Sequence, residues 1–387
     1  MGLGLGLRDK YKWYIFGLAF HLKKIQKNKV VVDNFFGRGY GDNPKYIVDE
    51  LLKSDKDIDI VWVVSGETDT TSFPNGVRTV KVGSIESIYE WMTAKIWIDN
   101  IKNYYKNKRS GQFYLQTWHG GVSMKRVEKA VEDNLDKGYV NASKRDSKII
   151  DAMLSNSSWQ TNDYKTNFWY NGPIYEVGLP RNDAFFSNSQ QITEKVKNFY
   201  GISDHHKIIL YAPTFRNHKT ISEQKELFAV DSDRIIQTCE KKFGSKYVFV
   251  ERFHPGIANK LNIQETENVK DGNMYPDMQE LLVASDILIT DFSSSIFDFV
   301  LKSNRVFLYG LDYDDYLSKE RGLNFDIKKE LAFTFSNTQE ELLSNIMSYD
   351  EERANENITG MKELLGLRDD GNASKKIAKM LIDVMEG

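Results

Sequence analysis

The stretch QFYLQTWHGGVSMKR, residues Gln112–Arg126, places a histidine between a strand pattern and a polar turn. Gln112–Gln116 has strand character, the turn is Thr117-Trp118-His119-Gly120-Gly121, and we expect a helix to begin at Ser123. In an open parallel sheet such a turn lies at the carboxyl end of a strand, where ligands bind. Histidine titrates near neutral pH and can accept a proton from a hydroxyl. His119 is therefore either a general base or a residue that only caps the turn.

The composition is that of a globular protein of two ordinary domains. The chain has 387 residues, of which 41% are hydrophobic and 28% are charged. A net charge of −3 argues against a surface built for nucleic acid. The single cysteine, Cys239, excludes an internal disulfide and a thiolate metal cluster, and it fits a reducing cytosol. No zinc spacing or phosphate-loop motif is present, so we expect neither a metal site nor a cofactor.

The first 28 residues carry basic side chains around the apolar segment Trp13–Phe20. Eight apolar residues are too few to cross a bilayer, which takes about 20. We expect an amphipathic helix that lies on an anionic membrane surface with Trp13, Tyr14, Phe16 and Phe20 inserted. The alternative is a helix that packs on its own domain.

Strand and helix patterns alternate along the rest of the chain, which predicts parallel sheets. A Gly/Pro-bearing segment, Gly178–Asp183, separates two lobes. Strands are expected in the first lobe at Val30–Val32, Ile58–Val64, Val77–Val82, Lys95–Asp99, Gln112–Gln116, Ile149–Ser155 and Ile174–Val177. Strands are expected in the second lobe at Ile208–Tyr211, Tyr247–Val250 and Ile287–Thr290.

Each strand of the second lobe is followed by polar residues, which the parallel arrangement brings to one edge of the sheet. These are Thr214 and Arg216, then His254, and then the run Asp291–Ser295. Serines at the start of a helix suit a phosphate, although Ser293 or Ser294 could simply cap that helix. Arg216 could pair with a phosphate, and His254 could donate to one or protonate a leaving oxygen. Asp298 could orient a serine or a ribose, or be a surface acid without a role.

Several motifs together resemble the CDP-glycerol glycerophosphotransferase family, whose members build teichoic acids and related polyol-phosphate capsules. The resemblance covers Val30 to Asp326 and rests on motifs in the family's order: TWHGG with Lys125 downstream, YAPTFR (Tyr211–Arg216), His254-Pro255, TDFSSSIFDF (Thr290–Phe299) and Arg321–Asp326.

The resemblance implies an α/β, GT-B-like architecture of two Rossmann-type lobes with parallel sheets that face a cleft. Residues 1–28 would be the membrane-surface helix, 29–177 the acceptor-side lobe and 178–387 the CDP-donor lobe. His119 would be the base that deprotonates the acceptor hydroxyl, and His254 would act on the pyrophosphate. The residues expected to bind substrate are Gly120, Lys125, Thr214, Arg216, Thr290, Asp291, Ser293, Ser294, Ser295 and Asp298.

The family implies transfer of glycerol phosphate from CDP-glycerol to a hydroxyl of a lipid-linked saccharide or growing polyol-phosphate chain, with release of CMP. The enzyme would act at the cytoplasmic side of the cell membrane as a peripheral protein. Two alternatives stay open: transfer of ribitol phosphate from CDP-ribitol, and a GT-B glycosyltransferase that uses a UDP- or GDP-sugar. A non-enzymatic membrane-binding module is a further alternative, in which the polar strand ends are structural.

Overall fold

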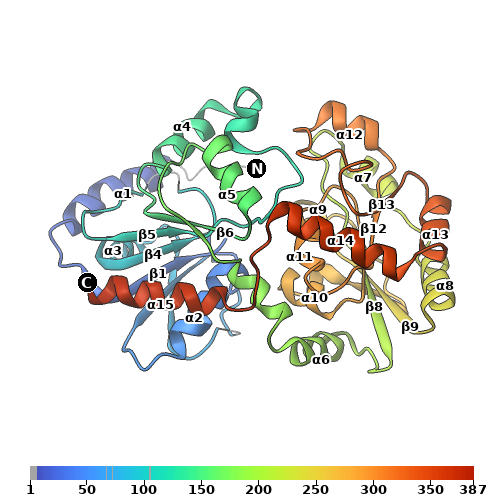
Figure 1. The fold of residues 1–387 in the computed structure, drawn as a ribbon. Helices are drawn as coiled ribbons and strands as arrows, with labels where there is room; N and C mark the ends of the chain where they lie inside the picture. Colours follow the sequence, from blue (N-terminus) through green and yellow to red (C-terminus); the bar gives the residue numbers. More distant parts are fainter. Residues whose placement is uncertain (1–6, 67, 72, 104–105) are drawn as a thin grey trace. The chain divides into compact units, whose positions relative to one another are not determined.

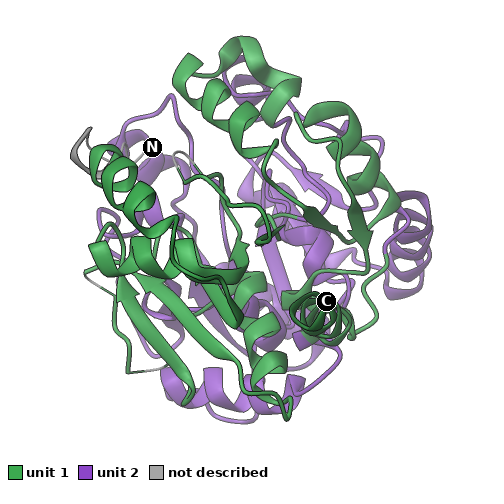
Figure 2. Ribbon diagram, turned by 90° about the vertical axis from the view of Figure 1, so that its left-hand side faces the viewer, with its two compact units in different colours: residues 1–120, 128–183, 368–387 green, residues 121–127, 184–367 purple. Residues whose placement is uncertain are grey.

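A computed structural model describes residues 7–66, 68–71, 73–103 and 106–387 of the chain. The chain forms two compact units, which Figure 2 shows in different colours. Unit 1 comprises residues 1–120, 128–183 and 368–387, and unit 2 comprises residues 121–127 and 184–367. Each unit is a parallel sheet with helices packed around it (Figure 1), so the expected pair of α/β lobes is confirmed.

The sheet of unit 1 has the strand order β3-β2-β1-β4-β5-β6-β7, and all of its described pairings are parallel. The strands are β1 (Gln26–Asp33), β2 (Asp59–Val64), β3 (Val77–Lys81), β4 (Ala94–Asp99), β5 (Phe113–Gln116), β6 (Ala152–Ser155) and β7 (Ile174–Glu176). The apolar run Val30–Val32 is fully buried, because β1 lies between β2 and β4. Every strand expected in the first lobe is present, with ends that differ by a few residues.

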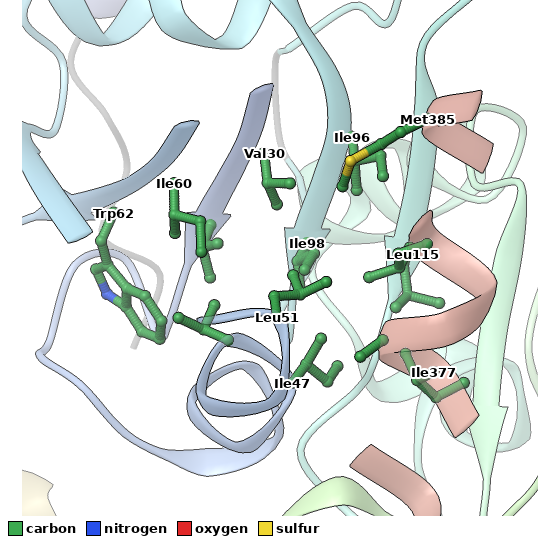
Figure 3. Packing of buried hydrophobic residues seen from close by; sticks show 14 of the residues in the cluster. Val30, Ile47, Leu51, Ile60, Trp62, Ile96, Ile98, Leu115, Ile377 and Met385 are labelled. Atoms are coloured by element: carbon green, nitrogen blue, oxygen red, sulfur yellow. The ribbon is translucent and has the colours of Figure 1, made fainter. Parts of the chain in front are cut away.

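Helices cover both faces of this sheet. They are α1 (Leu7–Phe20), α2 (Asp42–Leu52), α3 (Ile85–Thr93), α4 (Lys137–Asp146), α5 (Ser158–Asn167) and α15 (Ala373–Glu386). Figure 3 shows one core layer, in which Ile47 and Leu51 of α2 and Ile377 and Met385 of α15 point toward strand residues such as Leu115. Residues from both ends of the sequence therefore complete one hydrophobic core.

The end of the chain returns to unit 1 through a defined junction. Gly178 has a φ of +95° and packs against Asp369. The Asp369 carboxylate accepts hydrogen bonds from Leu179 N (2.9 Å) and Asn182 Nδ2 (3.0 Å). Asp183 then accepts from the first amides of α15, which begins at Ala373. The observed division therefore differs from the expected one, in which the second lobe extended from Gly178 to the last residue.

We predict that Leu381→Ala in α15 destabilises unit 1, although the residue lies about 200 positions beyond the main part of that unit. Leu381 is fully buried in the core layer, and truncation of a buried leucine costs about 2–5 kcal/mol. Leu364→Ala is the matched control, because Leu364 is 80% exposed and its loss should cost no more than about 0.5 kcal/mol. Urea unfolding measures both variants, and equal effects would contradict the assignment of α15 to this core.

The sheet of unit 2 has the order β10-β9-β8-β11-β12-β13, again with parallel pairings throughout its described strands. The strands are β8 (His206–Tyr211), β9 (Lys246–Glu251), β10 (Val269–Asp271), β11 (Ile287–Thr290), β12 (Val306–Tyr309) and β13 (Thr334–Ser336). The chain runs outward from β8 to β10 and then crosses to β11 on the other side of β8. The order thus reverses between β8 and β11, and open α/β sheets bind ligands at such a switch point.

The helices of unit 2 are short near the switch point and longer elsewhere. They are α6 (Ser189–Tyr200), α7 (Ile221–Leu227), α8 (Ser232–Phe243), α9 (Pro255–Ala258), α10 (Met278–Ala284), α11 (Ser295–Phe299), α12 (Tyr313–Lys319), α13 (Gln339–Met347) and α14 (Glu351–Leu365). Ile235 and Cys239 of α8 and Leu342 of α13 pack with sheet residues in the core. Cys239 is a buried, unpaired cysteine, and burial raises the pKa of its thiol to about 12.

The helix expected from Ser123 is wrong. Residues 123–126 form no helix, and Lys125 forms an antiparallel bridge with Leu323. The Arg126 amide donates to Gly322 O (3.1 Å), and the Asn324 amide donates to Met124 O (2.9 Å). Partners about 200 positions away in the chain thus satisfy the backbone groups that a helix would have paired locally.

The N-terminal helix α1 is present, but two of the aromatic residues expected to insert into a membrane pack against the protein instead. Trp13 is buried at 6% exposure, and α1 packs on α3, where the Phe20 ring lies 5.3 Å from that of Tyr89. Trp13 and Phe20 therefore face the protein, and they are not available for insertion into a membrane. The exposed apolar residues are Tyr11, Tyr14, Ile15 and Leu18.

Candidate active site

The turn that carries His119 follows β5 in unit 1 and is held in a strained conformation. Trp118 has a φ of +54°, a left-handed value that costs a non-glycine residue about 1–3 kcal/mol. Gln116 Oε1 accepts from the Trp118 amide (2.9 Å), and Asn43 Nδ2 donates to the Trp118 carbonyl (3.1 Å). The strain and these two hydrogen bonds together fix where the next side chain, that of His119, leaves the turn.

Two further residues, Arg181 and Gln160, bind the main-chain carbonyls of the residues that follow Trp118. Arg181 donates from its guanidinium to the His119 carbonyl (2.8 Å) and forms an ion pair with Asp42 (3.2 Å). Gln160 Nε2 donates to the Gly120 carbonyl (2.6 Å). Gly120 does not have a positive φ, so its expected role in substrate binding stays a prediction.

A backbone carbonyl determines which nitrogen of His119 carries the proton. His119 Nδ1 lies 2.8 Å from Asn100 O, and a carbonyl oxygen can only accept a hydrogen bond. The neutral imidazole therefore has its proton on Nδ1 and its lone pair on Nε2. This tautomer leaves Nε2 able to accept a proton, which is what a general base requires.

The electrostatic surroundings favour the neutral form of His119. His119 is an exposed residue, and the protein around its ring partly desolvates the imidazole, which lowers its pKa from 6.5. Asn100 O and Asp42 act in the opposite direction, and the positive charge of Arg181 adds to the lowering. At neutral pH the imidazole is therefore mostly unprotonated.

We predict that the His119 imidazole titrates below pH 6.5. Because its charged form is disfavoured, the resonances should move to the protonated position only as the pH falls through that lower value. A ¹H–¹³C NMR titration measures this, with His119→Ala to assign the signal. A midpoint at or above 6.5 would contradict the desolvated environment.

In unit 2 the switch point is organised by one buried carboxylate, that of Asp291. Its Oδ1 accepts from Thr214 N (2.8 Å) and Phe292 N (2.6 Å). Thr290 adds a second link between β8 and β11, because its hydroxyl donates to Ala212 O (2.6 Å). Thr290 and Asp291 therefore build the loop, and their expected contact with substrate stays a prediction.

Arg216 is buried beneath this loop, and its neighbours favour a structural role. The residue is 1% exposed, and its guanidinium donates to Asp291 (2.8 Å) and to both carboxylate oxygens of Asp312 (2.9 and 2.8 Å). It also donates to Thr214 O and lies over the rings of Phe292 and Tyr316. With each nitrogen already bonded, Arg216 positions Thr214 and Asp291 and is poorly placed to bind a phosphate as well.

The three serines have different surroundings. Ser293 and Ser295 lie with their hydroxyl oxygens 2.9 Å apart, and Ser293 Oγ also accepts from the Ser295 amide (3.3 Å). Ser294 makes no capping bond to α11, and instead its Oγ accepts from Met124 N (2.9 Å). Helix capping therefore accounts for Ser293 at most, whereas Ser294 joins α11 to the segment around Met124.

His254 follows β9 and begins the short helix α9. Its Nδ1 accepts from the Gly256 amide (3.1 Å), so the neutral ring carries its proton on Nε2. The ring stacks on Phe215 at 5.5 Å, and the residue is exposed. His254 thus has the opposite tautomer to His119, and it can donate a proton where His119 can accept one.

Lys125 contributes a cation to unit 2 at the same loops. Its Nζ lies 5.5 Å from the Tyr316 ring centre. Desolvation lowers its pKa to about 8, against the attraction of Asp291. Two hydroxyls of this region, Thr214 Oγ1 and Tyr316 Oη, are buried without a hydrogen-bond partner in the described structure. A bound anion would satisfy such donors, which is why Thr214 and Lys125 stay in the candidate site.

The remaining candidate from the sequence is Asp298, and several further residues also shape the site. Asp298 is buried in α11, and the structure does not test its proposed contact with a serine or a ribose. Across the described residues, we find no group of three or more His, Cys, Asp or Glu side chains suited to a metal ion. Five residues that hold this site in place were not singled out from the sequence: Asp42, Asn100, Gln160, Asp312 and Tyr316. Arg181 and Asn324 lie in the segments Gly178–Asp183 and Arg321–Asp326, for which the sequence indicated no individual role. Asn100 directly follows β4, so the rule that selected other polar strand ends could have found it.

Two parallel-sheet lobes of this topology, each with polar loops at its strand ends, define a GT-B-like α/β protein. The chain belongs to the CDP-glycerol:poly(glycerophosphate) glycerophosphotransferase family, whose model matches residues 15–383.

Relatives and a solved structure agree with this membership. The teichoic acid glycerol-phosphate transferase of Staphylococcus aureus is 31% identical over 92% of this chain and 93% of its own length. The teichoic acid poly(glycerol phosphate) polymerase of Staphylococcus epidermidis is 28% identical over 92% of this chain, which spans only 51% of that protein. The structure of the wall teichoic acid polymerase TagF matches with a TM-score of 0.85 and 26% identity, over 98% of this chain and 94% of that one.

Proposed function

We propose that the protein transfers glycerol phosphate from CDP-glycerol to a hydroxyl of a lipid-linked saccharide or growing polyol-phosphate chain in teichoic acid or capsule synthesis. The observation that carries this proposal is the His119 tautomer, which leaves Nε2 as a proton acceptor. Family membership and the relatives named for glycerol-phosphate transfer support the choice of donor.

In the proposed reaction, His119 Nε2 accepts the proton of the acceptor hydroxyl as its oxygen attacks the phosphorus of the glycerol phosphate. A new P–O bond forms, the P–O bond to the CMP phosphate breaks, and CMP leaves with that electron pair. Ser293, Ser295, Thr214 and Lys125 would bind the donor phosphates, and His254 would donate from Nε2 to the leaving oxygen. The protein acts by positioning and charge stabilisation, as phosphoryl transfer generally requires.

We predict that the protein releases CMP when offered CDP-glycerol and a lipid-linked disaccharide. His119→Ala should lower this rate by about 10²- to 10⁴-fold, the usual contribution of a general base. His205→Ala is the matched control and should retain the rate, because His205 is an exposed histidine. CDP-ribitol, a UDP-sugar and a GDP-sugar are offered separately.

Two outcomes of this assay would contradict the proposal. Release of UDP or GDP would show that the protein is a glycosyltransferase, and CMP release only with CDP-ribitol would identify the other polyol as substrate. Undiminished CMP release by His119→Ala would remove the role of base from that residue while leaving the donor assignment intact.

We also propose that the protein works as a peripheral protein on the cytoplasmic side of the cell membrane. No helix in the described part of the chain is both long and apolar enough to cross a bilayer. The face of α1 that does not pack on α3 exposes Tyr11, Tyr14, Ile15 and Leu18, which follow one another at helical spacing. Exposed lysines flank this face, namely Lys10, Lys12, Lys23 and Lys24. An apolar helix face with basic neighbours is suited to an anionic lipid surface.

We predict that the double variant Tyr14→Glu/Leu18→Glu binds liposomes of anionic phospholipid at least about tenfold more weakly, because two charges would then enter the lipid boundary. These side chains are 72% and 70% exposed, so the fold should tolerate both changes. Leu364→Glu, on the exposed side of α14, is the control and should bind normally. Sedimentation with vesicles measures the effect, and unchanged binding by the double variant would rule out α1 as the contact.

A further inference from the structure

A strap formed by two distant segments of unit 2 supports the serine loop. Residues 123–126 run antiparallel to residues 322–324, with the bridge between Lys125 and Leu323 at the centre. The amide of Arg126 donates to Gly322 O (3.1 Å). Met124 is fully buried, and its amide donates to Ser294 Oγ (2.9 Å). The strap therefore connects directly to one of the three serines.

Asn324 makes most of the contacts that join the two segments. Its carboxamide Nδ2 donates to Ser123 O (2.9 Å) and to Lys125 O (3.1 Å), so both of its N–H groups are used. Its own amide donates to Met124 O (2.9 Å). One side chain thus fixes the carbonyls on either side of Met124 and the backbone from which the Lys125 side chain extends.

The strap determines the direction of two groups suited to a phosphate. Because Ser294 Oγ accepts from the Met124 amide, its hydroxyl proton points away from that amide and can be donated to an anion. Lys125 extends from the strap so that its ammonium lies over Tyr316 and interacts with Asp291, Arg216, Glu320 and Arg321. A shift of the strap would move both groups together.

We propose that Asn324 is a positioning residue that holds Lys125 and Ser294 in place for the phosphates of a nucleoside diphosphate. Its carboxamide acts through these two residues and does not itself touch the ligand. The inference rests on the proposed function for the identity of the ligand, but the geometry on which it stands lies entirely within unit 2.

Binding of CDP measured by calorimetry tests the proposal first. Asn324→Ala removes two hydrogen bonds and should weaken CDP binding by about tenfold, with less effect on cytidine, which lacks the phosphates. Lys125→Ala should weaken CDP binding by a similar factor. The loss in the double variant should be clearly smaller than the product of the two single losses, because part of the effect of Asn324→Ala is exerted through Lys125 and is already removed in Lys125→Ala.

Controls separate positioning from general loss of stability. Asn345→Ala removes another half-buried carboxamide of unit 2, which donates to Ser336 Oγ, and it should bind CDP normally. Asn324→Leu keeps the side-chain volume without the donors, and it replaces the alanine variant if that protein does not fold. Independent, additive losses in the double variant, or equal losses for CDP and cytidine, would overturn the proposal.

A second measurement does not depend on any ligand. The rate at which acetic anhydride modifies Lys125, followed by peptide mass spectrometry across pH, should show an inflection near pH 8 in the unaltered protein. In Asn324→Ala the ammonium becomes more hydrated, so the inflection should rise toward the ordinary lysine value of about 10.4. An unchanged inflection would show that Asn324 does not position Lys125.

The two proposals fail in different ways. If the protein binds UDP or GDP in place of CDP, the proposed donor is wrong. The effect of Asn324→Ala is then measured on binding of UDP or GDP, and it still tests the positioning role. If CDP binds and the Asn324 variants bind it normally with unchanged Lys125 reactivity, the donor assignment stands and the positioning role is wrong.

Discussion

The buried carboxylate of Asp291 is the constraint on which the loops of unit 2 depend. It accepts hydrogen bonds from the amides of Thr214 and Phe292, and thereby joins the chain after β8 to the chain after β11. A carboxylate at 1% exposure is costly unless it is paired, and Arg216 supplies the opposite charge. The same guanidinium also pairs with the Asp312 carboxylate (2.8 Å), so Arg216 joins the two acidic side chains. Three charged residues therefore stabilise the switch point before any ligand binds.

Hydrogen bonds within the protein also set the state of both histidines, although here the partners are backbone atoms. Asn100 O fixes the proton of His119 on Nδ1, and the Gly256 amide leaves the proton of His254 on Nε2. A substitution of a neighbouring side chain does not remove a main-chain partner. The backbone at the strand ends therefore determines both tautomers. The result is one histidine prepared to accept a proton and another prepared to donate one.

Much of the fold could be predicted from the sequence, because the strands of a parallel sheet are buried on both faces and appear as apolar runs. Val30–Val32 and Ile287–Thr290 are examples. The rule that ligands bind at the carboxyl ends of strands also selected the loops at His119 and Asp291, which follow β5 and β11 in the structure. The strand ends could be predicted because both the apolar pattern and the polar residue that follows it are local in sequence.

What the sequence did not reveal depends on contacts between distant residues. The segment after Ser123 has the composition of a helix, but Leu323 and Asn324 pair with its backbone. Asp312, the partner of Arg216, lies 96 positions further along the chain and cannot be identified from spacing. The amphipathic pattern of α15 predicts one buried face, but it does not say which of two sheets that face will cover.

These distant contacts also determine how the protein can assemble. Unit 1 lacks part of its core until residues 368–387 are added, because Ile377 and Leu381 pack against the strands of its sheet. Unit 2 likewise takes residues 121–127 from the middle of the sequence of unit 1, and they carry the strap that reaches Ser294. Neither unit is therefore a continuous piece of chain that can complete its structure alone. A fragment cut at the apparent boundary near Gly178 would therefore expose apolar surface in both halves.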